Sequence, residues 1–271
     1  MGKKNEDEMS FLEHLEVLRW HLVRAILGIF VVAIAAFVFK NIIFDQVILA
    51  PKSPDFPTNV FLCNIGKLTG VLKLCINTLP LEIISIKMAG QFSMHIMVSL
   101  VAGFILAFPY VFYQFWSFIV PALHSKEKRH ARGAVFYSSF LFMLGVLFGY
   151  FLITPLTVHF LGSYSVSSEV TNQINLVSYV GTLASVVLAA GVIFELPVLA
   201  YFLTKVGLVT PDFMKKYRRH SLIVILLLSA IITPPDVFSQ VLVALPLLVL
   251  YEVGIMISKR IMRQQEREME S

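Results

Sequence analysis

The stretch LVSYVGTLASVVLAAGVIFELPVLAYFL, residues 176–203, decides the class of fold. Its only charged residue is Glu195. A helix rises about 1.5 Å per residue, so about 20 apolar residues cross a hydrocarbon core of about 30 Å. This run is long enough to span a membrane and too apolar for a helix on the surface of a soluble protein.

Outward from this run, five more apolar runs follow the same pattern. The six predicted spans cover about 22–44, 88–114, 134–156, 176–203, 220–232 and 237–257. Of the 271 residues, 57% are hydrophobic and 14% are charged. This balance excludes a soluble globular protein. It predicts an all-α polytopic membrane protein with a single integral membrane domain over residues 1–271. We expect no cleavable signal peptide, because the start is polar and acidic and the first apolar run is too long.

The basic residues predict the orientation of the spans. They gather in four places: the N-terminal end, the segment after the second span, the segment after the fourth span, and the C-terminal tail. These four places hold 17 of the 22 Lys and Arg residues, and the segments 157–175 and 233–236 hold none. Basic residues are retained on the cytoplasmic side of a membrane. Both termini are therefore predicted to be cytoplasmic. The net charge of +5 reflects these segments and does not imply nucleic-acid binding.

The last two spans are unusual. The run at 220–232 offers about 20 Å of helix, and Pro246 interrupts the run after it. The turn Thr233-Pro234-Pro235-Asp236 cannot lie in hydrocarbon unless protein or water covers it. We predict a pair of short helices that thins the bilayer locally. The alternative is a re-entrant hairpin that only packs.

The segment 45–87 is predicted to form an ordered extracytoplasmic cap. It is Pro-rich at its start and then becomes amphipathic at helical spacing. The two cysteines of the chain, Cys63 and Cys75, both lie in it. An oxidising compartment permits a disulfide, but the spacing does not decide between a disulfide and two free thiols.

Three polar residues lie near or within the last three spans, where an apolar residue would be expected. A carboxylate at Glu195, about 12 Å from the end of its span, costs a few kcal/mol unless it is paired, hydrated or protonated. Pro197 follows it and predicts a bent helix. Gln240 lies where it can bond a polar group on a partner helix, and Asp236 is suited to cap the last span. Each also has a purely structural interpretation.

Carboxylates also lie on the predicted cytoplasmic face. Glu13 and Glu16 precede the first span in SFLEHLEVLRWHL, and Ser10 with Glu13 matches a capping box. Glu127 stands alone in a basic loop. A carboxylate at a membrane surface can receive a guanidinium in a bidentate pair. An ordinary solvated loop charge is the alternative for Glu127.

No catalytic, metal-binding or cofactor-binding motif is present in the sequence. Two functions from other classes remain. One is a small-solute or ion carrier that uses Glu195, although carriers usually show several intramembrane charges and paired repeats. The other is a structural assembly scaffold.

The chain resembles the TatC family, the polytopic receptor subunits of the twin-arginine protein translocase. Four segments carry the resemblance: SFLEHLEVLRWHL before the first span, FPYVFYQFWSFIVPALHSKEKR from the second span onward, FELPV in the fourth, and TPPDVFSQ between the last two. The resemblance implies six helices in a concave, cupped arrangement in a bacterial cytoplasmic membrane. It implies a receptor for signal peptides with consecutive arginines on folded cargo. Export is then driven by the proton-motive force, with single-span partners of the TatA/TatB type in a multimeric complex.

The resemblance also implies roles for individual residues. It assigns the signal-peptide site to Glu127, Glu16, Phe118, Pro121, Glu13 and Arg19. It assigns the intramembrane carboxylate to Glu195, and the docking of partner subunits to the region of Thr233, Gln240 and Asp236. The family commonly has a second acidic residue where this chain has Val17.

Overall fold

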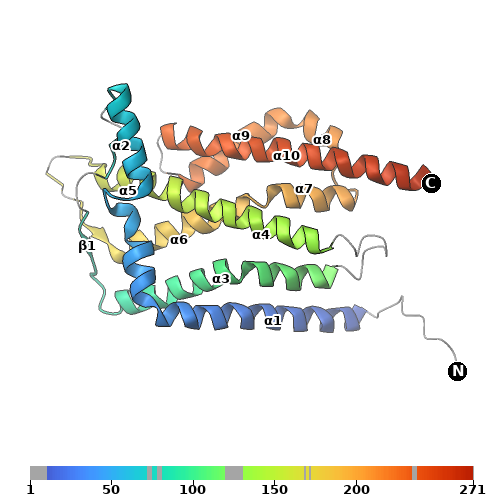
Figure 1. Ribbon diagram of the computed structural model, residues 1–271, viewed down its shortest axis with the longest axis horizontal. Helices are drawn as coiled ribbons and strands as arrows, with labels where there is room; N and C mark the ends of the chain where they lie inside the picture. The colour runs from blue at the N-terminus through green and yellow to red at the C-terminus, as the bar shows by residue number, and fades with distance from the viewer. Residues whose placement is uncertain are drawn as a thin grey trace. The chain divides into compact units, whose positions relative to one another are not determined.

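The computed structural model describes residues 11–71, 75–77, 81–119, 131–167, 169–170, 172–233 and 237–270. Within these ranges the side chains of 11–14, 119, 131–132, 237–238 and 268–270 are not described. The elements, in chain order, are α1 (Phe11–Val38), the π-helical η1 (Ile42–Ile48), the 3-10 turn η2 (Ala50–Lys52), α2 (Pro57–Thr69), β1 (Ile83–Ile84), α3 (Gly90–Ile119), α4 (Ala131–Phe148), the π-helical η6 (Gly149–Ile153), α5 (Thr154–Ser163), β2 (Ile174–Asn175), α6 (Leu176–Ile193), α7 (Leu196–Lys205), α8 (Pro211–Lys216), α9 (Arg218–Ile232) and α10 (Val237–Glu270) (Figure 1).

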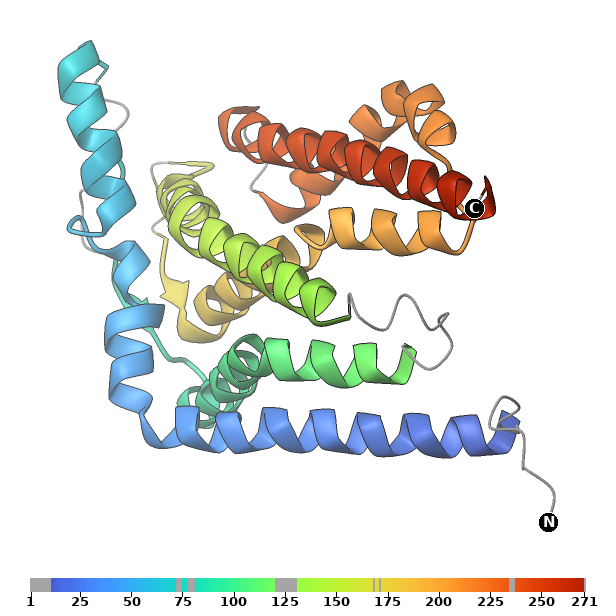
Figure 2. The ribbon, with the colours of Figure 1, turned by 45° about the vertical axis from the view of Figure 1, so that its right-hand side comes forward.

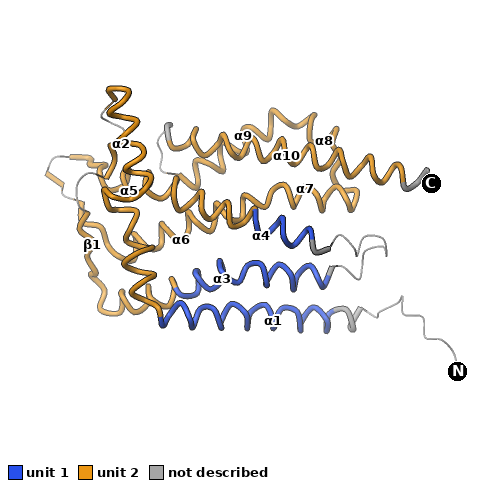
Figure 3. The backbone as a smooth tube through the Cα atoms, in the orientation of Figure 1, with its two compact units in different colours: residues 1–38, 99–140 blue, residues 39–98, 141–271 orange. Residues whose placement is uncertain are grey.

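The chain divides into two compact units, coloured separately in Figure 3. Unit 1 contains residues 1–38 and 99–140, and unit 2 contains residues 39–98 and 141–271. Each unit is described by itself below. The single membrane domain predicted from the sequence stays a prediction.

Among the described residues, five helical segments are long and apolar enough to cross a membrane. They cover Leu15–Val38, Gly90–Phe118, Gly133–Ser163, Leu176–Lys205 and Ser239–Arg267. Five of the six predicted spans are therefore confirmed as membrane-length helices, with ends shifted by several residues. The predicted 220–232 span is α9, whose 15 residues give about 22 Å of helix. The predicted short fifth helix is confirmed.

Two boundaries differ from the sequence prediction. The first span was predicted to reach residue 44, but α1 ends at Val38 and the chain continues as η1. The last span was predicted to be interrupted by Pro246, but α10 runs through this residue for 34 residues (Figure 2). A proline removes one backbone donor, and a long helix held by its neighbours tolerates that loss. The basic C-terminal tail is therefore the end of a helix.

In unit 1, α1 and α3 approach closely at two glycines. A methyl group on Gly103 would lie 2.8 Å from the Ala33 Cβ and 2.9 Å from the Ala33 backbone nitrogen. A methyl group on Gly28 would lie 2.7 Å from the Tyr110 ring. Small residues let helix backbones approach in apolar surroundings, where dispersion contacts drive association.

Unit 2 has its own core, in which glycines again let helices approach closely, here α4 and η6 against α6. A methyl group on Gly145 would lie 2.6 Å from the carbonyl oxygen of Ala190, and one on Gly149 would lie 2.9 Å from the Ala190 Cβ. Apolar side chains of η6, of α6 and the turn after it, of α9 and of α10 form this core, namely Ile153, Val186, Ala190, Phe194, Ile225, Val243, Ala244, Leu247 and Leu250.

The C-terminal helix braces the elements beside it. α10 packs against α7, α8 and α9, and the buried Thr204 hydroxyl of α7 donates to the Ser258 hydroxyl of α10 at 2.7 Å. Glu252 of α10 forms an ion pair with Arg218 at the start of α9. Both partners are about half exposed, so this pair contributes little to stability.

The predicted cap is an ordered part of unit 2. Pro57 occupies the first turn of α2, where its missing N–H costs nothing, and Gly70 ends the helix at a φ of 75°. Cys63 and Cys75 form a disulfide, so the structure decides the alternative that the spacing left open. The short strands β1 and β2 pair in parallel, with Ile83 opposite Ile174.

A buried asparagine joins this cap to α5. The Asn77 side chain donates to the Pro155 carbonyl at 3.1 Å, to Pro51 O at 3.4 Å and to the Asn59 side chain at 3.4 Å. Its backbone N–H donates to His159 Nδ1 at 3.3 Å. Asn77 has a φ of 52°, a conformation that asparagine tolerates better than most residues. Asn77 is therefore one of the residues that tie the cap to a membrane helix.

Candidate functional site

The N-terminal end of α1 presents the charged residues that we assigned to the signal-peptide site. Glu16 and Arg19 are both exposed, whereas Val17 between them is half-buried. On a helix, neighbouring positions point about 100° apart. The position where the family usually has its second acidic residue therefore faces partly inward here, and Glu16 carries the exposed carboxylate.

A histidine that the sequence analysis did not single out connects this end of α1 to α3. His21 Nδ1 lies 2.8 Å from the Gln114 side-chain oxygen, which accepts the ring N–H. The His21 ring also meets the ring of Phe118 edge-on, with centroids 6.5 Å apart. Phe118 is thus held beside α1 in unit 1. The available sequence signal was a histidine two residues after Arg19, in the same charged stretch as Glu16.

Aromatic rings line one face of α3 toward Phe118. Phe104, Phe108, Phe112 and Trp116 follow at intervals of four residues, with successive centroids 6.0, 5.9 and 6.3 Å apart. Residues four apart lie on the same face of a helix. Trp116 is only 4% exposed, so this row is part of the packing of unit 1.

Three of the predicted signal-peptide residues cannot be placed. Pro121 and Glu127 lie outside the described residues, and for Glu13 only the helix that contains it is described. Their assignment stays a prediction. Of this set, the structure places Glu16, Arg19 and Phe118 in unit 1.

Glu195 stands at a break between two helices, as Pro197 led us to predict. α6 ends at Ile193 and α7 begins at Leu196, so Glu195 lies on the turn between them. Its N–H donates to Val192 O at 3.1 Å, and its carbonyl accepts from the N–H groups of Val198 and Leu199 at 2.9 Å. The residue is half-buried, and its Oε1 atom is enclosed by protein. The turn that carries Glu195 also contains Phe194, whose side chain is anchored in the core of unit 2. This anchor positions the carboxylate.

The turn between α9 and α10 carries the residues assigned to partner docking. Thr233 is buried and its hydroxyl donates to Ser229 O at 2.7 Å, which closes the end of α9. Gln240 Nε2 donates to Leu226 O at 3.1 Å and links α10 to α9. One donor of each residue is therefore used within the chain, and Asp236 lies outside the described residues. Their docking role stays a prediction.

These features define a class of protein: a multi-pass membrane protein with exposed charge at the start of its first membrane helix and a carboxylate at a break inside another. The chain belongs to the TatC family, because the family model described as Sec-independent protein translocase protein (TatC) matches residues 13–246. The family prediction is confirmed. It favours a translocase component over the carrier and scaffold alternatives.

Curated relatives agree over nearly the full length. The TatC protein of Blattabacterium sp. subsp. Periplaneta americana is 38% identical over 94% of this chain and 97% of its own. That of Aquifex aeolicus is 33% identical over 95% of this chain and 98% of its own. Both are described as Sec-independent protein translocase protein TatC.

Solved structures confirm the fold. A crystal structure of the twin arginine translocase receptor TatC matches 92% of this chain and all of its own, with a TM-score of 0.67 and 33% identity. A second crystal structure of that receptor, in DDM, matches with a TM-score of 0.69 and 33% identity over 91% of this chain. The all-α polytopic fold is therefore that of the TatC family.

Proposed function

We propose that this chain is the receptor for twin-arginine signal peptides and the core subunit of a translocase that exports folded proteins. The family assignment supports this function, and one observation in the structure supports a site at the start of α1. Glu16 is exposed on α1, five residues before His21, which bonds Gln114 and contacts Phe118 on α3. An exposed carboxylate at the charged end of an apolar helix suits a peptide with an Arg pair followed by an apolar segment.

The proposal assigns the steps of recognition to different places. Glu127 and Glu16 receive the guanidinium groups at the cytoplasmic face. Glu195 acts later, in deep insertion of the peptide or in recruitment of partners. Single-span subunits of the TatA/TatB type dock near Thr233, Asp236 and Gln240. Both termini are cytoplasmic in a bacterial inner membrane, the complex is multimeric, and the proton-motive force drives transport.

The test is binding of a synthetic signal peptide to the purified full-length chain in detergent. We expect an Arg-Arg peptide to bind and a Lys-Lys peptide of otherwise identical sequence to bind at least about tenfold more weakly, because lysine cannot form the bidentate pair. Glu127→Ala and Glu16→Ala should each remove this preference. Glu82→Ala provides a matched control, because Glu82 is an exposed carboxylate of the predicted cap.

Val17→Glu separates the two ways in which the test can fail. If the natural chain shows no preference and Val17→Glu restores it, recognition here depends on a partner subunit. If neither chain distinguishes the peptides, and unfolding curves show that both are folded, the receptor function is wrong.

A further inference from the structure

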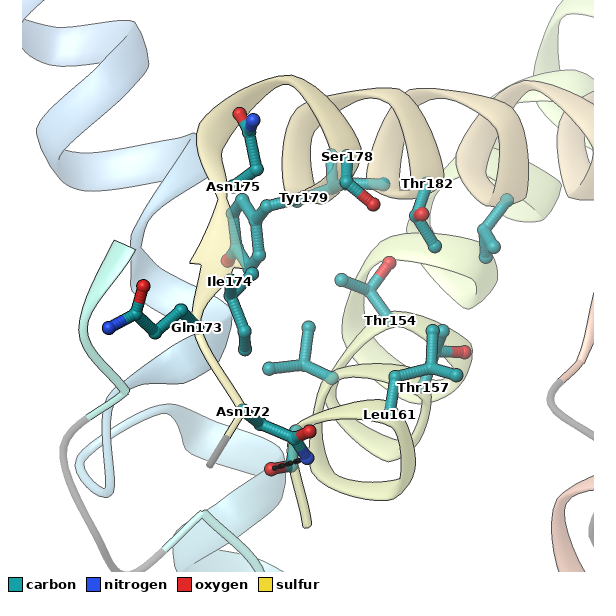
Figure 4. Close-up of a pocket in the computed structure, with 14 residues that line it drawn as sticks. Thr154, Thr157, Leu161, Asn172, Gln173, Ile174, Asn175, Ser178, Tyr179 and Thr182 are labelled. Atoms are coloured by element: carbon teal, nitrogen blue, oxygen red, sulfur yellow. Dashed lines mark hydrogen bonds between the residues drawn. The ribbon is translucent and has the colours of Figure 1, made fainter. Parts of the chain in front are cut away.

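A cavity of about 460 Å³ lies in unit 2 between α5, β2 and α6 (Figure 4). Thr154, Thr157 and Leu161 of α5 face Ser178 and Thr182 of α6 across it, and Asn172 lies at one end. Its volume is within the range of about 300–1,000 Å³ typical of small-molecule sites. None of the signal-peptide or docking residues named above lines it.

The cavity is polar at one end and apolar at the other. Asn172 and Asn175 contribute amides at the start of α6, several hydroxyls lie along the walls, and Leu183 and Val186 lie deepest along α6. Among the described residues that line it, none is acidic, basic or a histidine. The lining therefore suits an uncharged, amphiphilic group and offers no ion pair to a free anion or cation.

The hydroxyls of the lining differ in whether a ligand can reach them. Thr154 donates to Gly149 O and Tyr179 to Ile48 O, both at 2.9 Å, and the Thr157 oxygen is enclosed by protein. Ser178 is exposed and Thr182 is half-buried. A molecule that enters the cavity therefore meets the hydroxyls of these two residues of α6.

The depth of the cavity matches one leaflet of a bilayer. It lies where two membrane-length segments, Gly133–Ser163 and Leu176–Lys205, have their cap-side ends. From Leu176 to Val186 the helix rises about 15 Å, which is about half of a hydrocarbon core. Water alone suits it poorly, because it would take about fifteen molecules against largely apolar walls.

We propose that this cavity binds one phospholipid from the leaflet on the cap side. The ester and glycerol oxygens of the lipid accept the hydroxyls of Ser178 and Thr182. One acyl chain extends along α6 toward Val186. The charged headgroup stays outside, because no charged side chain of the cavity lining meets it.

The experiment uses the full-length chain in nanodiscs of dioleoyl phosphatidylethanolamine and dioleoyl phosphatidylglycerol, released into native mass spectrometry. Ser178→Phe fills the cavity, and Ser185→Phe is the matched control because Ser185 is exposed on α6 and does not line the cavity. Thr182→Val removes a hydroxyl of the lining and keeps the shape. A phospholipid with a diazirine on its acyl chain near the ester then maps the contact in each variant.

We expect the natural chain to retain one lipid with no preference between the two headgroups. Ser178→Phe should lose that lipid, Ser185→Phe should keep it, and Thr182→Val should weaken retention about fivefold. Photolabelled peptides should fall within 154–162 or 172–186. The proposal is overturned if no lipid is retained, if Ser178→Phe retains it as well as Ser185→Phe does, or if labelling falls elsewhere.

Discussion

His21 on α1 and Gln114 on α3 are joined by a hydrogen bond of 2.8 Å between residues 93 positions apart. Gln114 is 6% exposed, so the bond is shielded from water on one side. The same imidazole contacts Phe118. One side chain therefore couples the charged end of the first helix to the aromatic end of the third.

Replacing Gln114 with Met should weaken both the fold and recognition. Met has a similar volume but cannot accept the His21 N–H, so we expect a loss of about 1–2 kcal/mol in the free energy of unfolding. We also expect a severalfold weaker affinity for an Arg-Arg signal peptide, because Phe118 loses its support. Thermal unfolding in detergent and peptide titration measure the two effects. Tyr113→Phe, at an exposed neighbouring position, should change neither.

Enlarging Gly103 should force α1 and α3 apart. Even Gly103→Ala puts a methyl group 2.9 Å from the backbone of Ala33, which cannot rotate away, so we expect a loss of about 1–3 kcal/mol. Gly181→Ala is the matched control. Among the described residues, no atom beyond its chain neighbours and its own helix backbone lies within 4 Å of the added methyl group, and alanine should stabilise that helix by about 0.5–1 kcal/mol. Equal unfolding temperatures for the two variants would contradict this account.

Asn77 should prove more sensitive than its place in an irregular segment suggests. Asn77→Ala loses the bonds to Pro155, Pro51 and Asn59, and it also puts alanine at a φ of 52°. Asn77→Gly loses the same bonds but tolerates that φ. We expect Asn77→Ala to be the less stable of the two by about 1 kcal/mol. Protease digestion of the cap, read by mass spectrometry, should follow the same order.

Reducing the Cys63–Cys75 disulfide should loosen the cap and leave the membrane helices folded. The bond closes a short loop, and its removal should cost about 2–3 kcal/mol in the cap. Hydrogen exchange of α2 with and without a reductant measures the effect, and the double variant Cys63→Ser/Cys75→Ser should reproduce it without one. Faster exchange throughout α6 and α10 would show that the cap also supports the membrane helices.

Glu195→Ala should impair export more than it impairs the first binding of the signal peptide. Glu195→Gln keeps the shape and the hydrogen-bonding capacity, so its comparison with Glu195→Ala separates the need for a charge from the need for a polar group. Pro197→Ala restores a backbone donor and should straighten the break between α6 and α7. Export of a twin-arginine reporter and binding of its signal peptide are measured together. An unchanged export rate in Glu195→Ala would remove the proposed later role.

The sequence by itself determined the class of protein, five membrane-length helices, the short α9 and the break at Glu195. These features depend on the length and polarity of local runs and on single prolines, so they can be read without neighbours. The amphipathic cap helix was predictable for the same reason. The path of α10 through Pro246 was mispredicted, because its packing against α7 and α9 offsets a local preference.

Only the tertiary structure decided which distant residues meet. Four contacts join residues whose spacing in the sequence follows neither a helical nor a strand period. They are the disulfide, the bond between His21 and Gln114, the bond from Asn77 to α5, and the bond from Gln240 to α9. The cavity beside Thr157 is formed by three elements that the sequence separates. Such contacts depend on how helices pack, and packing is set by the shapes of all the side chains between them rather than by any one segment.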